Sequence, residues 1–258
     1  MPYDGIRYLR CAALLVDSCF KFFRAIAGQV VTMLAEHLET KVWEIVDSYY
    51  PRRDWAHGRS HIERVLRTAV EIGKREGADT EIIELSAILH DIFANKEKHT
   101  GVEGFRHEIE ASKEARNILK TLGLAERTVD AVCHCIESHR KRTGRIQPQT
   151  IEAKCLFDAD KLDCIGAIGI VRSAFMSLEQ GQEFYKEEDV DAYARRNIRP
   201  DGTVIDFAQH SSNLEYELSL KEVAKRMYTE TGKRLARERA VFMDEFYSRL
   251  GKELKGII

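Results

Sequence analysis

The sequence lacks an excess of charge of either sign. Forty basic and forty-two acidic side chains among 258 residues leave a formal net charge of −2. Such a chain has no overall attraction for nucleic acid or for an anionic membrane, so an anionic substrate must be held by local charges. The basic run from Arg140 to Arg142, continued by Arg145, is short and has no interleaved aromatic residues. We therefore expect no specific nucleic-acid partner.

Cysteines are few, and none of them forms a Cys-x-x-Cys pair. This usage is typical of reduced thiols in a cytoplasmic chain and excludes a dense disulfide framework. The Cys133-x-Cys135 spacing is a weak metal signal, and we expect these two side chains to pack in the core instead. The six cysteines are Cys11, Cys19, Cys133, Cys135, Cys155 and Cys164.

The sequence has no long uninterrupted hydrophobic run. Residues 6–34 are rich in Leu, Val, Ala and Phe, but Asp17, Lys21 and Arg24 interrupt them, so no stretch reaches the roughly 18–20 apolar residues of a transmembrane segment. No small-residue cleavage site follows a short apolar core, which argues against a secretory signal. We expect residues 1–35 to form an amphipathic helical extension, packed on the body or lying on a partner or membrane surface. A natural translation start at Met33 is the alternative.

Apolar residues recur at intervals of three and four almost throughout, and strand-like alternation is nearly absent. This pattern predicts an all-α fold, with a single domain over residues 36–258. Ser60, with Glu63, and Asp79 or Thr80 are expected helix caps, and Gly77 and Gly123 expected helix ends. The four prolines (2, 51, 148 and 200) fall between the expected helices. These helices are 8–34, 36–49, 59–76, 80–94, 107–122, 125–140, 149–159, 162–179, 187–197 and 211–252, the last broken near Thr231 and Gly232.

The pair His90-Asp91 lies within an otherwise apolar stretch, Leu85–Phe93. An unpaired buried carboxylate or imidazole costs roughly several kcal/mol, so this pair needs a partner. His61 upstream and Asp160 downstream could close with it around one divalent cation. A mixture of imidazole and carboxylate suits Mn, Fe, Zn, Ni or Co better than Ca.

Other polar residues flank these four. His57 precedes His61 by one helical turn, so both imidazoles share a face; His57 either faces a phosphate there or only caps the helix start. Arg64 lies on a neighbouring line of the same helix. Asp160 stands between Asp158 and Asp163, and we expect one of the three to be a ligand and the others to cap a helix starting near Lys161.

The ordered signature His61, His90-Asp91, Asp160 resembles that of the HD-domain superfamily of metal-dependent phosphohydrolases. About 200 residues share the resemblance to one branch of predicted HD hydrolases, including residues 210–254 but not residues 1–35. The resemblance implies an HD-type helical bundle with C-terminal helices. The matching stretches are His57–Val65, Leu89–Ile92, Ile136–Arg140 and Asp158–Gly169.

The resemblance also implies a ligand set. His61, His90, Asp91 and Asp160 would hold one divalent ion (Mn, Fe, Ni, Co, Zn or Mg), and His107 and His139 are candidates for a second. His107 could equally be an exposed residue in the first turn of its helix, and His134 or His99 could compete with it. Some HD nucleotidases carry a Glu three residues beyond the Asp, where this chain has Ala94, so the proton-transfer residue stays unassigned.

The function that follows is hydrolysis of a phosphate ester, of a small nucleotide or another phosphorylated metabolite, by metal-activated water. Asp91, Arg64 and Lys161 are the expected catalytic residues, and a homodimer is compatible with the sequence. Two alternatives stay open: an HD-type di-iron oxygenase, and a non-catalytic HD module that senses a ligand or binds a protein. Residues expected to contact the phosphorylated substrate are His57, Arg64, Lys161 and Arg140, with Lys96 and Lys98 as further cations.

Overall fold

This computed structural model describes residues 37–52, 54–96, 105–140, 146–200 and 202–257. The predicted extension, residues 1–35, lies outside the described residues. The chain divides into two units, Met1–Glu44 and Ile45–Ile258. In the first unit the described residues 37–44 are helical. Everything below concerns the second unit.

The fold is all-α, as predicted. The described residues contain no named strand, and their only bridges are the isolated pairs Glu183–Ser211 and Ile198–Val204. No described helix combines the length and hydropathy that a membrane span requires. The elements of the second unit, in chain order, are η1 (Asp47–Tyr49), α2 (Arg59–Glu76), α3 (Thr80–Leu89), α5 (His107–Thr121), α6 (Glu126–Ser138), α7 (Ile151–Leu162), α8 (Gly166–Glu179), α9 (Val190–Asn197), η2 (Phe207–Gln209), α10 (Ser212–Leu218), η3 (Leu220–Arg226) and α11 (Glu230–Leu254).

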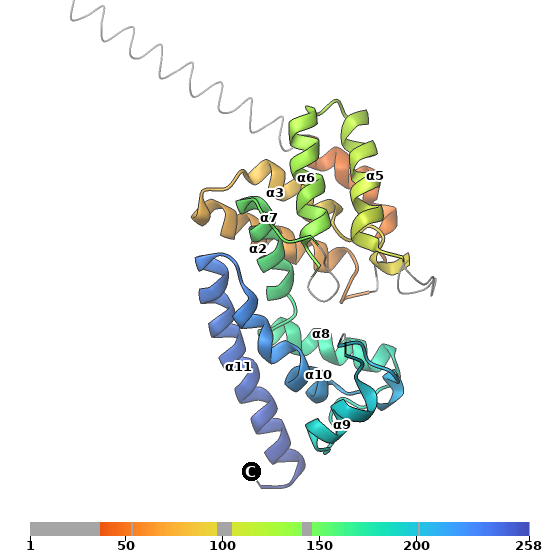
Figure 1. The fold of residues 1–258 in the computed structure, drawn as a ribbon, viewed down its shortest axis with the longest axis vertical. Coiled ribbons are helices and arrows are strands. Elements are labelled where there is room, and N and C mark those ends of the chain that lie inside the picture. The colour runs from red at the N-terminus through yellow and green to blue at the C-terminus, as the bar shows by residue number, and fades with distance from the viewer. Residues whose placement is uncertain (1–36, 53, 97–104, 141–145, 201, 258) are drawn as a thin grey trace, which may run out of the picture. The chain divides into compact units, whose positions relative to one another are not determined.

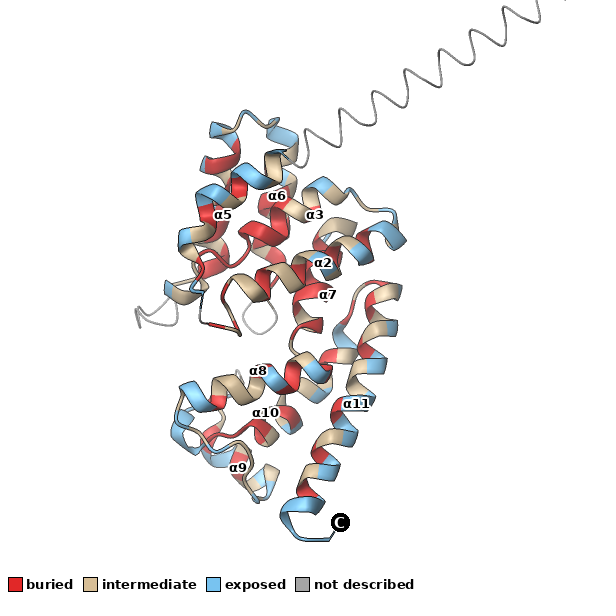
Figure 2. Ribbon diagram, turned by 180° about the vertical axis from the view of Figure 1, so that it is seen from behind, coloured by how far each residue is buried: buried red, intermediate tan, exposed pale blue. Residues whose placement is uncertain are grey.

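The helices pack in two connected groups. In the first, α5 lies against α6, α3 against α6, and α2 against both α3 and α7. In the second, the long C-terminal helix α11 runs beside α8 and reaches back to α7 and α2 (Figure 1). Buried residues follow the inward faces of these helices (Figure 2). One apolar core joins the groups: it includes Val65 and Ile72 of α2, Leu156 of α7, and Met243 and Tyr247 of α11.

Some predicted helix ends are confirmed and one is wrong. Asp79 caps α3 by accepting from the backbone N–H groups of Glu81 and Ile82, and Gly77 ends α2 in the left-handed region. Ser60 is not a cap, because α2 begins one residue earlier and Gly58 is its N-cap. A Cβ atom at Gly58 would meet the carbonyl oxygen of Pro51 at 2.1 Å. The chain enters the helix here through a contact that only glycine permits.

Three boundaries near the predicted site also differ from prediction. Helix α3 ends at Leu89, so His90 is its C-cap and Asp91 lies beyond it. Helix α7 continues to Leu162, so no helix starts near Lys161 and the aspartates cannot cap one there. The predicted helix 211–252 is interrupted at Ser219 and again at 227–229, which ends two residues before the predicted break near Thr231. Thr229 caps α11 at this break.

Asp158 causes the break before α11. Its carboxylate is buried and accepts from the backbone N–H groups of Tyr228 and Thr229, at 2.9 and 2.8 Å, and from Oγ1 of Thr229 at 2.7 Å. Those backbone groups are therefore satisfied by a side chain of α7 and not by a continuing helix. This contact ties the start of α11 to the group of helices that carries the predicted ligands.

Candidate metal centre

Six polar side chains meet where α2, α3, α5, α6 and α7 come together. His61 lies on α2, His90 and Asp91 at and beyond the end of α3, and Asp160 on α7. His107 begins α5 and His139 is the C-cap of α6. All of them are buried, with at most 8% of any of these residues exposed. The structure thus brings together every side chain that the sequence predicted as a ligand, from five separate segments.

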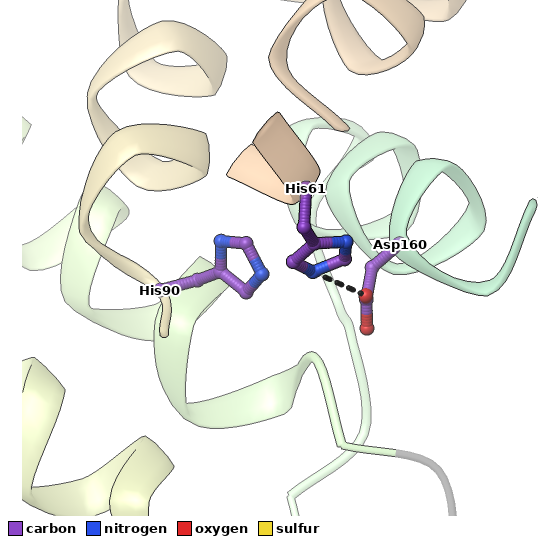
Figure 3. Close-up of side chains that lie close together, drawn as sticks. All are labelled: His61, His90 and Asp160. Atoms are coloured by element: carbon purple, nitrogen blue, oxygen red, sulfur yellow. Dashed lines mark ion pairs between the residues drawn. The ribbon is translucent and has the colours of Figure 1, made fainter. Parts of the chain in front are cut away.

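The ligand atoms form two overlapping groups. In the first, nitrogen or oxygen atoms of His61, His90 and Asp160 all lie within 4.8 Å of one another. Figure 3 shows the two imidazoles turned toward the carboxylate, with Nε2 of His61 3.5 Å from Oδ1 of Asp160. The second group, at the same mutual distance, contains His90, Asp91 and His139. His90 belongs to both groups, so the two are contiguous.

His107 adjoins the second group. Its Nε2 lies 3.2 Å from Oδ1 of Asp91 and 3.3 Å from Nε2 of His139. Nε2 of His139 is itself 3.3 Å from the same oxygen of Asp91. His107 is therefore not an exposed residue of the first turn of its helix, and its ring faces the cluster.

Two of the histidines are aimed by the helices that they terminate. Nδ1 of His90 donates to the carbonyl oxygen of Ala87 at 2.8 Å, and Nδ1 of His139 to that of Ile136 at 2.6 Å. The last carbonyl groups of a helix have no partner within the helix, so each offers an acceptor at this position. Since a carbonyl only accepts, each Nδ1 carries the proton, and each Nε2 presents a lone pair to the cluster.

Three buried atoms at the centre form no well-aligned hydrogen bond among the described residues, although Nε2 of His107 and of His139 lie 3.2 and 3.3 Å from one of them, Oδ1 of Asp91. They are Nε2 of His61, Nε2 of His90 and Oδ1 of Asp91. A buried acceptor without a partner costs about 1–3 kcal/mol, and more when charged. His61 and His90 belong to one group of mutually close atoms and His90 and Asp91 to the other, an arrangement that fits divalent cations because imidazole nitrogen and carboxylate oxygen are ligands for such ions.

The protonation states of His90, Asp91 and Asp160 suit cation binding. Burial lowers the pKa of His90 to about 4, so this imidazole is neutral at pH 7. Burial by itself would raise the pKa of Asp91, but His90, His107 and His139 together hold it well below its ordinary value. Burial likewise opposes ionisation of Asp160, whose pKa is nonetheless lowered, chiefly by Lys161. Neutral imidazoles and ionised carboxylates are the forms that bind metal.

Asp163 lies behind the cluster and orients His61. Its Oδ2 is 2.7 Å from Nδ1 of His61, which leaves Nε2 facing the other ligands. The sequence singled out Asp163 but expected a ligand or a helix cap. Burial opposes its ionisation, yet hydrogen bonds from Arg64 and His61 hold its pKa low. A carboxylate hydrogen-bonded to a ligand histidine fixes its tautomer and ring orientation.

Arg64 is hydrogen-bonded to Asp163 and to the backbone of Trp55. Its Nε donates to Oδ1 of Asp163 at 2.7 Å, and its Nη2 to Oδ2 at 2.8 Å and to the carbonyl oxygen of Trp55 at 3.1 Å. The guanidinium also stacks on the Trp55 ring at 4.0 Å. Its Nε and Nη2 are hydrogen-bonded, and Arg64 is not among the described residues that line the cavity beside the cluster. The structure shows Arg64 holding Asp163, and its contact with substrate stays a prediction.

A cavity of about 520 Å³ opens on the cluster. Three of the predicted substrate residues, His57, Lys161 and Arg140, line it. Nζ of Lys161 is 2.5 Å from Oδ2 of Asp160, and Arg140 pairs with Glu108 at 3.2 Å. His57 lies 3.6 Å from Asp54, and burial lowers its pKa. Lys96 is described and contacts Phe93, whereas Lys98 and His99 lie outside the described residues.

Helix α8 and the segment after it supply the far wall, whose individual residues the sequence analysis did not single out. Arg172 and Ser177 come from α8, and His210 and Glu215 from the region of α10. Nδ1 of His210 is 2.7 Å from the hydroxyl of Tyr193, and its Nε2 is 3.2 Å from Glu215. Arg172 could have been found, because it is the one charged residue in the apolar run Gly166–Leu178. The far-wall residues come from segments with no recognisable spacing.

Comparisons with known proteins agree with this geometry. The family model of the HD domain matches residues 58–165, a stretch that contains all six clustered side chains. YpgQ of Bacillus subtilis (strain 168) is 32% identical over 227 residues, which cover 86% of this chain and 95% of YpgQ. A crystal structure of YpgQ in complex with ADP is 26% identical with a TM-score of 0.63, covering 86% of this chain and 98% of that one. An HD-superfamily hydrolase from Bacillus thuringiensis is 25% identical with a TM-score of 0.60, covering 87% and 98%.

Proposed function

This chain belongs to the HD-domain superfamily, and from that premise we propose that it is a metal-dependent phosphohydrolase acting on a small nucleotide or a similar phosphorylated metabolite. The observation that carries the proposal is a pair of buried imidazole nitrogens, Nε2 of His61 and Nε2 of His90, that form no hydrogen bond among the described residues and belong with Asp160 to one group of mutually close atoms beside a cavity. Similarity to an HD-superfamily hydrolase supports the reaction class.

In this proposal His61, His90, Asp91 and Asp160 hold the first ion, with manganese the first metal to test. When bound, a divalent ion would polarise a phosphoryl oxygen and lower the pKa of a coordinated water from about 15.7 toward 7. Asp91 faces both ligand groups, with Nε2 of His61 at 3.7 Å from its Oδ2 and Nε2 of His107 at 3.2 Å from its Oδ1. Its second function is to orient the attacking water.

The cations of the cavity would bind the phosphate oxygens. Lys161 and Arg140 both line it, and both have counter-ions, Asp160 and Glu108, that keep them in place. Fixed positive groups stabilise the charge that spreads over a phosphoryl group during transfer. Ala94 also lines the cavity, so at this place the chain supplies no acid to protonate the leaving group.

The far end of the cavity suits the uncharged part of such a substrate. Its hydrogen-bonding side chains include Ser177, His210 and Glu215, and no described Lys or Arg lines it away from α8 and the cluster. A volume of about 520 Å³ lies within the range of about 300–1,000 Å³ usual for small-molecule sites. The complex of YpgQ with ADP supports a nucleotide or a ligand of similar size.

A second candidate function is a di-iron oxygenase. It is favoured by His107 and His139, which lie 3.2 and 3.3 Å from Asp91 and could hold a second ion beside the first. Two irons per chain together with oxygen consumption would select this function, whereas phosphate release with other divalent ions would select hydrolysis. The third alternative, a non-catalytic HD module, would require a folded protein that binds no divalent ion.

We extend the proposal to the organisation and location of the chain. In this proposal the HD domain with its C-terminal helices occupies residues 36–258, and the predicted extension, residues 1–35, lies outside the described residues. A cytoplasmic location is supported by four free cysteines, Cys133, Cys135, Cys155 and Cys164. A homodimer remains part of the proposal and is checked by the mass of the protein in solution.

Metal content and a substrate panel test the function together. The purified chain is loaded in turn with Mn, Co, Ni and Mg and offered nucleoside mono-, di- and triphosphates and a generic aryl phosphate. We expect phosphate release that His90→Ala and Asp91→Ala abolish. His37→Ala, a change at an exposed histidine in the other unit, should leave turnover unchanged. Wild-type turnover in both cluster variants would refute the proposed mechanism.

A further inference from the structure

Arg172 is a buried charge in an apolar helix. It lies on α8, and its side chain is only 9% exposed. An ionised group in such surroundings needs partners, because burial penalises the charged form. One of its donors has such a partner. Nη1 of Arg172 donates to Oδ2 of Asp163 at 3.0 Å and lies 3.0 Å from Nδ1 of His61.

Two arginines share Asp163 but use it differently. Arg64 donates from Nε and Nη2 to both carboxylate oxygens and from Nη2 to a backbone carbonyl. Arg172 donates to the shared carboxylate through Nη1 alone. Among the described residues, no hydrogen bond is formed by its Nε or Nη2. Arg172 also lines the cavity, which Arg64 does not.

Arg172 lies beside the cluster, since its Nη1 is 3.0 Å from Nδ1 of His61 and its side chain lines the cavity. Lys161, Asp160 and Asp91 line the same cavity. The planar guanidinium offers donors in a fork that matches two oxygens of a phosphate, which an ammonium group cannot do. Because Nη1 is anchored on Asp163, the orientation of this fork is set before a ligand arrives, and little side-chain entropy is lost on binding.

We infer that Arg172 binds non-bridging oxygens of the phosphoryl group at the metal centre through Nε and Nη2, while Nη1 remains on Asp163. This inference rests on the proposed function, since it assumes a phosphorylated ligand. It makes α8 part of the catalytic site: the helix contributes the third cation of the cavity, together with Lys161 and Arg140. The competing explanation is that Arg172 serves only as a counter-ion for Asp163.

Arg172→Met and Arg64→Met form a matched pair, because both remove a cation from Asp163 and only one removes a donor from the cavity. Each full-length variant is loaded with manganese and titrated with inorganic phosphate in a calorimeter, and manganese affinity is measured separately without phosphate. We expect Arg172→Met to weaken phosphate binding about 10-fold to 100-fold, in line with loss of a charge-assisted bidentate contact. With enough manganese to fill the site in both variants, phosphate binding by Arg64→Met should stay within about threefold of wild type, since that change removes no donor from a residue that lines the cavity.

Equal losses of phosphate affinity in the two variants, or none in Arg172→Met, would overturn the inference in favour of the counter-ion explanation. If Arg172→Met does not fold, Arg172→Lys replaces it. Lysine keeps the positive charge but lacks the paired donors of the guanidinium, so phosphate binding should still weaken several-fold. Wild-type phosphate affinity in Arg172→Lys would overturn the inference. Failure of this inference can be distinguished from failure of the proposed function. Phosphate binding that depends on Arg172 without turnover of any ester refutes the function alone, and turnover with unchanged KM and kcat in Arg172→Met refutes the inference alone.

Discussion

Oδ2 of Asp163 lies 2.7 Å from Nδ1 of His61, so a carboxylate outside the ligand cluster sets the orientation of one of its imidazoles. The same carboxylate forms ion pairs with Arg64 of α2 and Arg172 of α8. It stands at the end of α7, three residues after Asp160. Asp163 therefore links three helices to a single ligand nitrogen, Nε2 of His61.

We predict that Asp163→Asn lowers metal affinity about 10-fold to 100-fold without removing any ligand. An amide can bond to His61 but carries no charge to match two arginines, and it can present the wrong group to Nδ1, so Nε2 is held less well. The measurement is manganese affinity by calorimetry. Asp158→Asn is the matched control, because it makes the same change on the same helix at a side chain that bonds to Thr229 and not to the cluster. Equal affinities for Asp163→Asn and wild type would contradict the prediction.

The two ligand groups lead to a prediction about stoichiometry. His139 belongs only to the second group, and His107 adjoins it. We expect the wild-type chain to bind two manganese ions, and the double change His107→Ala with His139→Ala to reduce this number to one, because His61, His90 and Asp160 stay intact. Metal content after gel filtration gives the number directly. A wild-type protein with a single ion that the double variant retains would show that these two histidines do not ligate.

His90 makes the stability of the metal-free protein depend on pH. Its pKa is about 4 in the folded chain and near 6.5 as an ordinary histidine, because burial disfavours the charged ring. Between these values the unfolded chain takes up a proton that the folded chain does not, so stability falls as pH is lowered from about 6.5 to 4. The loss from this residue reaches about 3 kcal/mol at the acid end.

Urea unfolding with a chelator present, at pH 7 and pH 5, measures this effect. His90→Gln removes the titrating group and keeps a polar side chain, so its loss of stability over this interval should be smaller than that of wild type. The comparison isolates His90 from neighbouring titrations, including that of His61, whose pKa is raised. If the free energy of unfolding falls equally in the two proteins between pH 7 and pH 5, the pKa of His90 in the folded chain is that of an ordinary histidine.

We predict that Asp158→Ala destabilises the fold while leaving metal affinity unchanged. The substitution removes three hydrogen bonds at the start of α11 and leaves two backbone N–H groups without their acceptor. The expected loss is about 1–3 kcal/mol in the free energy of unfolding. Glu245→Ala is the control, since that residue is exposed on α11 and should change stability by no more than about 0.5 kcal/mol. Unfolding in urea measures both, and equal stabilities would contradict the prediction.

The local features of this protein could be predicted from its sequence. Helical periodicity identified most of the helices, and Asp79 and Gly77 marked helix ends correctly, because capping depends on a few neighbouring residues. The order His61, His90-Asp91, Asp160 was enough to predict a cluster, since buried polar residues in apolar helices need a common partner. The same local rules failed at Ser60 and placed the break before α11 two residues too late, near Thr231. There the helix ends are fixed by Gly58 packed against Pro51 and by Asp158 reaching Thr229, contacts between separate segments.

Only the tertiary structure decided which charges serve the centre and which serve the fold. Asp158, Asp160 and Asp163 are near neighbours at one helix end, yet their roles differ. Asp158 bonds to Thr229 at the start of α11, Asp160 faces Nε2 of His61, and Asp163 bonds to Nδ1 of His61. Arg64 and Arg172 likewise differ in whether they reach the cavity. Sequence spacing defines the direction of a side chain from its own helix, but its partner is set by the helices packed around it. For that reason the sequence determined the fold class and the clustered residues, and packing determined the role of each charge.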